Sequence, residues 1–398
     1  MADRRSVQLS FDGDGSEVFA LALKTGLLTF ATLGVYRFWA KTRLRGYFWS
    51  RSRLDGDGLE YTGTGLEMFR GFLIAVVVLA VYMSVVQVVF YFIGLRFVIN
   101  PQTEAEVLGQ VLLLYSSFFA LAPLMLFARY RSLRYKLVRT RFRGIRFGME
   151  SAAWAYAWRA SLYLIATLCT LGLLHPLMRF RLEKFMADRV SFGDARLVQG
   201  GSSTELYGAM KHVFIGLGLL IAAAAFGAVG LGPIAVVLGV PGYLWAIVGV
   251  LSYQVQGFAM LTRSKRLDLG PGREAVTFAS APRTGSIIGY YILGSLAVGG
   301  AAAVVGASLA QLGASLEPSL RALPQAVVIG IGVLTYVAVL IFLGAVNLAV
   351  TTRMVLGHVI TTTTVLNPDG LSGVRQRAGE AGGDAEGFAD ALDIGGAF

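Results

Sequence analysis

The sequence has only one cysteine, Cys169, and few charged residues for its length. A single cysteine excludes both an intramolecular disulfide framework and a cysteine-based zinc site. Charged residues occupy 15% of the 398 positions and hydrophobic residues 55%. A soluble domain cannot bury that much apolar surface around one core. The composition therefore predicts an all-α polytopic membrane protein.

Catalytic signatures are also missing. The sequence contains no G-x-S-x-G elbow, no H-E-x-x-H zinc helix, no Rossmann fingerprint and no kinase motif set. Its three histidines, His175, His212 and His358, lie in separate segments, so a shared metal site would need coincidental proximity. We expect no enzymatic activity and no cofactor.

Long apolar runs dominate the chain instead. Six of them are free of charge and long enough to span a bilayer, namely residues 72–94, 107–128, 213–232, 234–258, 287–309 and 327–350. Two more, 18–36 and 152–177, are long enough but carry Lys24 in the first and Arg159 with His175 in the second. The second pair therefore needs a separate argument.

The distribution of basic residues supplies that argument. Stretches 37–53, 129–146, 179–196 and 263–283 are rich in Lys and Arg, which predicts a cytoplasmic location for all four. If 18–36 or 152–177 crossed the membrane once, one basic flank of each would lie on the wrong side. We therefore predict two re-entrant or interfacial helical hairpins, with both termini cytoplasmic. Eight ordinary spans with one violated loop are the alternative.

The predicted hairpins share a repeated turn. Thr32, Leu33 and Gly34 have counterparts at Thr170, Leu171 and Gly172, and the flanking residues match at the same offset. This pattern predicts an internal parallel duplication. We expect one membrane domain over 1–366, with repeat units at about 6–146 and 145–265 and an extra helix pair at about 285–350. A disordered cytoplasmic tail is expected over 367–398.

A second phrase recurs ahead of the membrane segments. Phe11-x-Gly13-x-Gly15-x-Glu17 is followed by Tyr61-x-Gly63-x-Gly65-x-Glu67 and by Gln199-x-Gly201-x-Ser203-x-Glu205. Each copy predicts a short strand, a glycine turn and a helix with an acid near its positive end. These strands are expected to form small β-elements on the cytoplasmic face.

Polar residues near or inside the apolar segments are the candidate functional residues, because a charge in hydrocarbon is costly and persists only with a partner, water or a use. The candidates for a pathway or an anion contact are Lys24, Arg159, Gln87, Gln254 and Asn347. The alternative is that the two cations extend to the head groups and that the amides hold helices together.

The basic and aromatic stretch 36–53 is typical of a helix lying on anionic lipid. Its candidate lipid-interface residues are Trp39, Lys41, Arg43, Arg45, Trp49 and Arg51, and a plain topology anchor is the alternative. The net charge of +11 is explained by such flanks, so we expect anionic lipid head groups and no nucleic acid as partners.

The phrase FDGDGSEVFALALKTGLLTFATLGVYRFWAKTRLRGYFW, followed by LEYTGTGLEMFRGF, resembles the YjgN-like bacterial inner-membrane proteins, a family built on a domain of unknown function. The resemblance implies a multi-pass inner-membrane protein and brings no catalytic residues. The paired hairpins and the partly buried cations suggest a transporter or channel-like protein for a small solute or lipid. The alternative is a non-transporting scaffold that binds or organises lipid, because the spans lack acidic residues.

Overall fold

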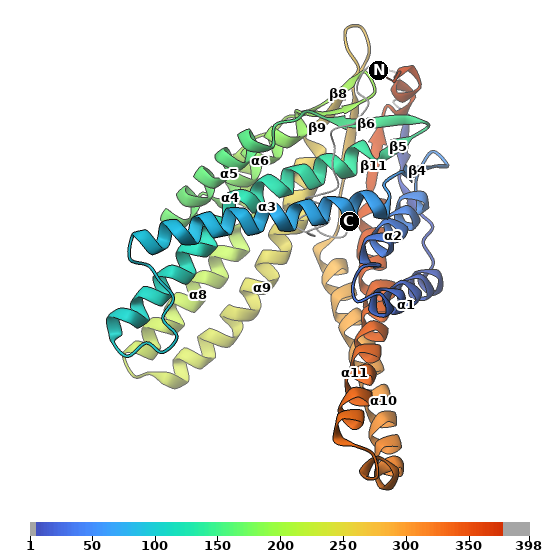
Figure 1. The fold of residues 1–398 in the computed structure, drawn as a ribbon. Coiled ribbons are helices and arrows are strands. Elements are labelled where there is room, and N and C mark those ends of the chain that lie inside the picture. Colours follow the sequence, from blue (N-terminus) through green and yellow to red (C-terminus); the bar gives the residue numbers. More distant parts are fainter. Residues whose placement is uncertain (1–4, 377–398) are drawn as a thin grey trace. The chain divides into compact units, whose positions relative to one another are not determined.

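The computed structural model describes residues 5–376 and is predominantly helical (Figure 1). Among these residues, six helices have the length and composition needed to cross a membrane. They are α3 (Gly65–Phe92), α4 (Glu104–Val138), α8 (Lys211–Ala228), α9 (Gly232–Arg263), α10 (Thr284–Arg321) and the stretch Gln325–Thr361, which joins α11 (Gln325–Asn347), a π-turn (Leu348–Thr352) and α12 (Arg353–Thr361). Each coincides with one predicted span, so a polytopic helical protein is confirmed.

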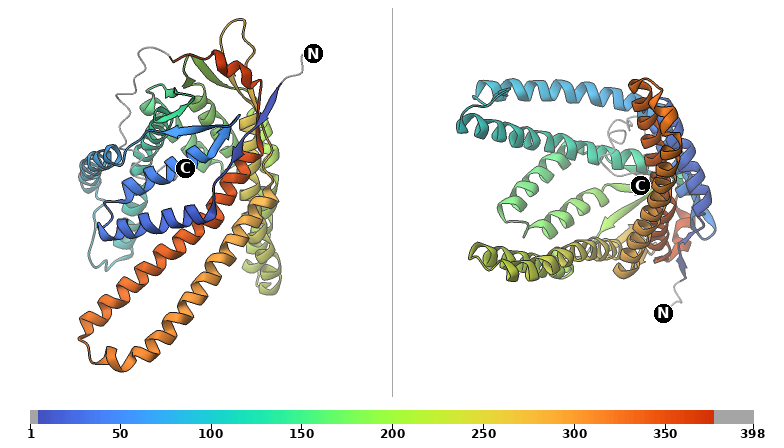
Figure 2. Two further views of the ribbon diagram at one scale, coloured as in Figure 1. Left: turned by 90° about the vertical axis from the view of Figure 1, so that its right-hand side faces the viewer. Right: turned by 90° about the horizontal axis from the view of Figure 1, so that it is seen from below.

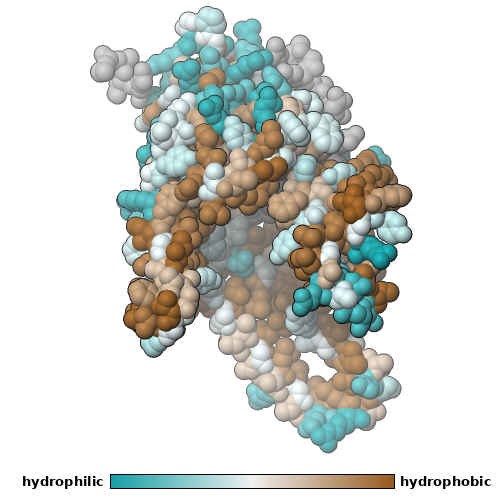
Figure 3. Space-filling view, turned by 90° about the vertical axis from the view of Figure 1, so that its left-hand side faces the viewer, coloured by the Kyte–Doolittle hydropathy of each residue, from teal (hydrophilic) through white to brown (hydrophobic). Residues whose placement is uncertain are grey.

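Protein covers very little of these six helices. Between 0 and 11% of the most apolar window of each one is buried. Figure 3 shows hydrophobic residues, in brown, along the long helices. Exposed apolar surface on this scale is typical of a protein that contacts membrane lipid.

Two shorter helix pairs occupy the segments predicted as hairpins. The first is α1 (Gly15–Ala31) with α2 (Arg37–Arg51), and the second is α5 (Ala153–Cys169) with α6 (His175–Ala187). A helix of 17 residues is about 25 Å long, which is shorter than the hydrocarbon core of about 30 Å. Both segments fold back as helical hairpins. Their entry into a membrane stays a prediction.

Short strands bracket every helix pair. In chain order they are β1 (Ser6–Gln8), β2 (Ser10–Phe11), β3 (Ser52–Leu54), β4 (Asp57–Tyr61), β5 (Thr140–Phe142), β6 (Ile145–Met149), β7 (Val190–Phe192), β8 (Ala195–Gln199), β9 (Lys265–Asp268), β10 (Val276–Ser280) and β11 (Thr363–Leu366). The order strand, two helices, strand therefore occurs five times, with the short α7 (Ser203–Ala209) added ahead of α8. This repeating unit is shorter than the predicted repeat units of about 6–146 and 145–265. The last helix pair, α10 with α11, has the same order of elements.

Contacts divide the chain into two compact units. Unit 1 comprises the described residues up to Glu60 together with Glu205–Lys265 and Val276–Asp369. Unit 2 comprises Tyr61–Thr204, Arg266–Ala275 and the described residues from Gly370 onward.

Within unit 1, β2, β3 and β4 pair antiparallel, as do β1, β11 and β10. Phe11 on β2 is the partner of Ser52 on β3. Since these two residues flank the α1–α2 hairpin, the hairpin leaves and returns at one place. Asp55 and Gly56 connect β3 to β4 with φ of 55° and 86°, as a two-residue primed turn requires.

Unit 2 contains the antiparallel ladder β5, β6, β7 and β8. The strands that flank the α5–α6 hairpin pair with each other, with Phe147 opposite Phe192. Beneath them, Tyr130 and Tyr156 have their ring centroids 5.4 Å apart in a buried cluster that also contains Leu182 and Met186. The ladder and this cluster fix the base of the second hairpin.

Two predictions need correction here. An all-α fold with small β-elements understates the β-structure, because the described residues contain eleven strands in extended ladders. The predicted disordered tail also begins too early, since Pro368–Gly373 form a 3-10 helix and Arg375 donates its backbone N–H to Asp194. The remainder of that prediction, 377–398, lies outside the described residues.

Helices within unit 1 pack in pairs. Figure 2 shows α10 and α11 side by side, with α1 against α11. Phe19 on α1 meets Phe342 on α11 edge to face at 5.7 Å between ring centroids. Helices α8 and α9 approach closely, because a Cβ added to Gly216 would lie 2.6 Å from the backbone nitrogen of Ala246.

Candidate functional site

Residues Thr32, Leu33 and Gly34 lie in the turn between α1 and α2. Leu33 and Gly34 have φ of 50° and 92°, and the Gly34 N–H donates to the Thr29 carbonyl at 2.7 Å. The Thr32 hydroxyl donates to the Leu28 carbonyl at 2.8 Å and accepts the Tyr36 N–H at 2.8 Å. The threonine therefore supplies an acceptor for the Tyr36 N–H, which the start of the next helix leaves without an intrahelical partner.

The second turn repeats this geometry. Leu171 and Gly172 have φ of 51° and 90°, and the Gly172 N–H donates to the Thr167 carbonyl at 2.8 Å. The Thr170 hydroxyl donates to the Ala166 carbonyl at 2.9 Å and accepts the Leu174 N–H at 3.3 Å. All these bonds join residues equivalent to those of the first turn, at one constant offset.

The two turn leucines are unusual in both conformation and environment. A non-glycine residue with positive φ is uncommon, and asparagine and aspartate tolerate it best. Five such residues occur in the described chain, and three of them are Asp55, Arg143 and Asn367. The other two are Leu33 and Leu171, which are 93% and 89% exposed. Each turn thus has an exposed leucine side chain at its tip.

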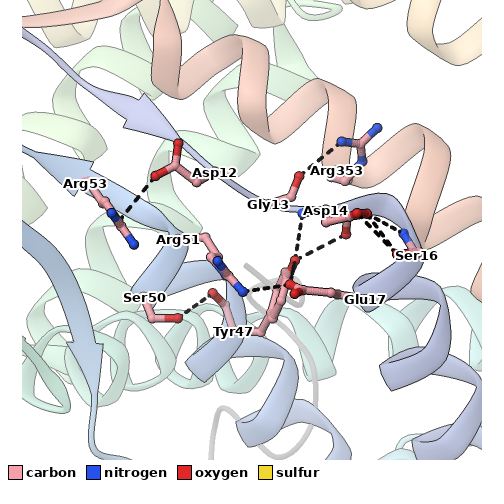
Figure 4. Close-up of polar contacts among 10 residues, drawn as sticks. All are labelled: Asp12, Gly13, Asp14, Ser16, Glu17, Tyr47, Ser50, Arg51, Arg53 and Arg353. Carbon is pink, nitrogen blue, oxygen red and sulfur yellow. Dashed lines mark hydrogen bonds and ion pairs between the residues drawn. The ribbon is translucent and has the colours of Figure 1, made fainter. Parts of the chain in front are cut away.

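Polar contacts close the base of the first hairpin (Figure 4). The Glu17 carboxylate accepts from the Tyr47 hydroxyl at 2.9 Å and from the Arg51 guanidinium at 2.7 Å. Asp14 caps α1 by accepting the Ser16 N–H at 2.8 Å, and this bond holds the pKa of its carboxyl below the ordinary value. Burial and the Glu17 carboxylate raise the pKa of the Tyr47 phenol. We call Glu17, Tyr47 and Arg51 the first clasp.

An equivalent clasp lies in unit 2, at the base of the α3–α4 pair. The Glu67 carboxylate accepts from Tyr135 at 3.1 Å and from Arg139 at 2.9 Å. In both clasps the acid lies in the first turn of one helix, and the tyrosine and arginine lie four residues apart at the end of the next. The predicted acid near each helix start is confirmed for α1 and α3. The arrangement ties helix ends together.

The predicted pathway residues lie on five different helices. Lys24 on α1, Gln254 on α9 and Asn347 on α11 are exposed side chains of unit 1. In unit 2, Arg159 is exposed on α5 and has its guanidinium carbon 4.9 Å from the Phe185 ring centroid. Gln87 on α3 donates to the Ser117 hydroxyl on α4 at 2.9 Å. Gln87 therefore links two helices of one pair.

The predicted lipid-interface residues differ in exposure. Arg43 on α2 is exposed, with its guanidinium carbon 5.5 Å from the Tyr36 ring centroid. Trp39, Lys41, Trp49 and Arg51 are half-buried. Arg45, by contrast, is fully buried at 0% exposure, so its predicted place among lipid head groups is wrong. It lies on the inner face of α2 with Phe38 and Phe48.

Unit 2 also contains an apolar groove of about 410 Å³. Helix α3 contributes Ile74, Val78 and Tyr82, α4 contributes Pro123, Leu124, Phe127 and Arg131, and α5 contributes Trp154. We call this the α3–α4 groove. No motif in the sequence indicated it, because its walls come from three helices. A cluster of three or more His, Cys, Asp or Glu able to hold a metal does not occur within residues 5–376.

Comparison with known proteins shows which family the chain resembles. The model of a family described as bacterial protein of unknown function (DUF898) matches residues 6–372, which is nearly the whole chain. The chain belongs to this family. It is also similar to inner membrane protein YjgN of Salmonella typhimurium, with 25% identity over 169 residues, and of Escherichia coli O157:H7, with 28% identity over 148 residues.

These alignments cover 42% and 37% of the chain, and 38% and 32% of the relatives, so the chain spans about a third of the length of the curated proteins that it matches. No solved structure matches it. For this DUF898 protein, the family match and the six apolar helices together show an integral, multi-pass protein of the bacterial inner membrane.

In this DUF898 protein, several residues that hold the helix ends together were not predicted from the sequence. Arg353 on α12 donates to the Gly13 carbonyl at 3.1 Å, which ties the last helix of unit 1 to the first glycine turn. Tyr47 and Tyr135 were not singled out as partners of Glu17 and Glu67. A signal was present, since both tyrosines lie four residues before an arginine at the end of a basic helix.

Proposed function

We propose that this inner-membrane protein binds and organises anionic phospholipid at the cytoplasmic face, with its two short hairpins inserted into one leaflet. The observation that carries the proposal is the pair of tip leucines, Leu33 and Leu171. A left-handed conformation costs a non-glycine residue about 1–2 kcal/mol. In water, an exposed leucine at that position gains nothing in return. In hydrocarbon, its side chain is solvated by lipid.

The apolar surface around the tips supports the same conclusion. On the first hairpin, Leu27, Phe30 and Val35 are 48%, 39% and 43% exposed. Their equivalents on the second hairpin, Ile165, Leu168 and Leu173, are 55%, 50% and 55% exposed. Both hairpins thus expose the same apolar positions, as helices that are embedded in lipid to the same depth would.

Cations on α2 supply the complementary charge. Arg37 and Arg43 are exposed, and both lie against aromatic rings, at 5.7 Å from Phe38 and 5.5 Å from Tyr36. Cations near a membrane surface attract anionic head groups, and each Lys or Arg contributes about 1 kcal/mol to the binding free energy. We assign the head-group contact to these two arginines and not to the buried Arg45.

The depth of the tips tests this proposal. An environment-sensitive fluorophore is attached to Leu33→Cys or to Leu171→Cys in a Cys169→Ala background, and the protein is reconstituted in phosphatidylglycerol nanodiscs. We expect blue-shifted emission and quenching by lipids that carry a nitroxide on the acyl chain. Asp55→Cys is the matched control, because Asp55 is also exposed with φ of 55° but lies in a strand turn. Emission at Leu33 that equals the water-like emission at Asp55 would refute insertion.

A transporter or channel-like role is the second candidate. The observation in its favour is the Gln87–Ser117 hydrogen bond, which places polar groups between two candidate spans. Flux through proteoliposomes that is lost in Lys24→Ala and Arg159→Ala would support that role. Wild-type flux in both variants would remove these residues from a pathway.

A further inference from the structure

The α3–α4 groove has a fixed apolar wall. Pro123 lies inside α4 and has no backbone N–H to donate, so the helix lacks one internal hydrogen bond there. Beside it, the Tyr82 hydroxyl of α3 donates to the Ala120 carbonyl of α4 at 2.6 Å. This bond joins the two helices at the proline end of the groove. The groove is thus part of the folded pair.

The opposite end of the groove is cationic and aromatic. Arg131 lies eight residues after Pro123, which is about 12 Å along the helix. Its guanidinium carbon is 5.8 Å from the Phe127 ring centroid, and Phe127 lies 4.5 Å from the Trp154 ring. Trp154 is 68% exposed. An arginine near the end of a candidate span, with a tryptophan packed beside it, is typical of the membrane interface.

We propose that the α3–α4 groove retains one anionic phospholipid of the surrounding bilayer. One acyl chain lies between Val78 and Leu124, and the phosphate lies at Arg131 beneath the Trp154 ring. This inference rests on the proposed lipid-binding function and adds the site and the class of lipid.

Three properties of the groove identify this occupant. Most of its wall residues lie on α3 and α4, two helices that are apolar enough to span a membrane, where lipid is the surrounding solvent, and α5 adds Trp154. Its volume of about 410 Å³ is within the range of about 300–1,000 Å³ found for ligand pockets. The charge of Arg131 complements a phosphate, and a guanidinium offers several donors in one plane.

A photoreactive phosphatidylglycerol with a diazirine in its acyl chain tests the proposal in nanodiscs containing the full-length protein. We expect the crosslink to map to the peptides that contain Val78 and Leu124. Val78→Trp fills the groove and should reduce the crosslink about tenfold. Val77→Trp is the matched control, because Val77 is 63% exposed on the same helix and does not line the groove.

Charge is tested separately. Arg131→Gln should remove the preference for phosphatidylglycerol over phosphatidylethanolamine in competition, whereas Arg129→Gln, an exposed cation on the same helix, should keep it. Equal crosslinking in Val78→Trp and Val77→Trp, or an unchanged preference in Arg131→Gln, would overturn the assignment. The Arg131→Gln result decides the matter if Val78→Trp does not fold. If Leu33 inserts into the bilayer but either of these groove tests is negative, the lipid site in the groove is refuted and the proposed function is not.

Discussion

At the scale of single residues, the Glu17 carboxylate holds together the two ends of the α1–α2 hairpin. Glu17→Gln keeps an acceptor for the Tyr47 hydroxyl but removes the ion pair with Arg51, in which the two side chains are 48% and 34% exposed. We expect a loss of about 1 kcal/mol in the free energy of unfolding, because a partly exposed pair is screened by solvent. Denaturation in detergent micelles, followed by circular dichroism, measures it. Glu60→Gln, at an exposed carboxylate on β4, should change stability by less than about 0.5 kcal/mol.

Asp194 gives a prediction that depends on pH. Its carboxylate accepts the Arg375 N–H at 3.0 Å and lies 3.3 Å from the Arg273 guanidinium, and these contacts lower the pKa of its carboxyl. An ordinary aspartate has a pKa of about 3.9. Because the folded pKa is lowered, the stabilisation is present above about pH 4 and is lost as the pH falls through the folded value.

Asp194→Asn should therefore speed hydrogen exchange in the peptide 368–376 about fivefold at pH 7, as loss of an exposed charged contact of about 1 kcal/mol implies. Exchange mass spectrometry of both proteins from pH 7 to pH 2.5 measures the ratio. The ratio should approach one at the acid end. A ratio that is independent of pH would show that the Asp194 charge does not hold this segment.

At the scale of elements, the α8–α9 pair depends on glycines that allow close approach. A Cβ at Gly216 would lie 2.6 Å from the Ala246 nitrogen and 2.7 Å from its Cα, so backbone must move to admit it. Gly216→Ala should lower the free energy of unfolding by about 1–3 kcal/mol. Gly218→Ala should be neutral or stabilising, because a Cβ there meets nothing within 4 Å. Unfolding of both variants in detergent checks the difference, and equal stabilities would mean that the pair tolerates separation.

Sequence patterns predicted some of the helices, strands and turns and missed others. The long spans were predictable because a run of 20 apolar residues has few alternative structures. The phrases ahead of α1, α3 and α7 indicated β2, β4 and β8. In contrast, β3, β5, β7 and β9 were missed, since three or four residues are too few to display alternation. Thr32 and Gly34 indicated their turn because the same residues recur at Thr170 and Gly172. The burial of Arg45 was invisible, because its helix is basic on several faces and only packing selects the inner one.

At the scale of the whole molecule, pairing between flanking strands fixes where each helix pair begins and ends. Phe11 pairs with Ser52 and Phe147 with Phe192, while Phe278 pairs with Val365 across the α10–α11 pair. Each of these helix pairs therefore begins and ends at the same place. The N-terminal strand follows the rule, since Val7 pairs with Val365. This connectivity favours an even number of crossings within each helix pair. It disfavours the alternative of eight spans, in which the first hairpin would cross once and Phe11 and Ser52 would lie on opposite sides.

Cysteine labelling tests that connectivity directly. In a Cys169→Ala background, Asp55→Cys and Arg143→Cys lie in turns between strands, and Asn100→Cys and Leu323→Cys lie in turns between long helices. Because the strand turns adjoin the most basic stretches, they should react with an impermeant maleimide only in inverted vesicles. The helix turns should react only in intact spheroplasts.

Leu33→Cys should react slowly from both sides, because a tip in hydrocarbon has little water to form its thiolate. Labelling of Asp55→Cys and Asn100→Cys from the same side would contradict the arrangement, and fast labelling of Leu33→Cys from the periplasm would show that the first hairpin crosses the membrane.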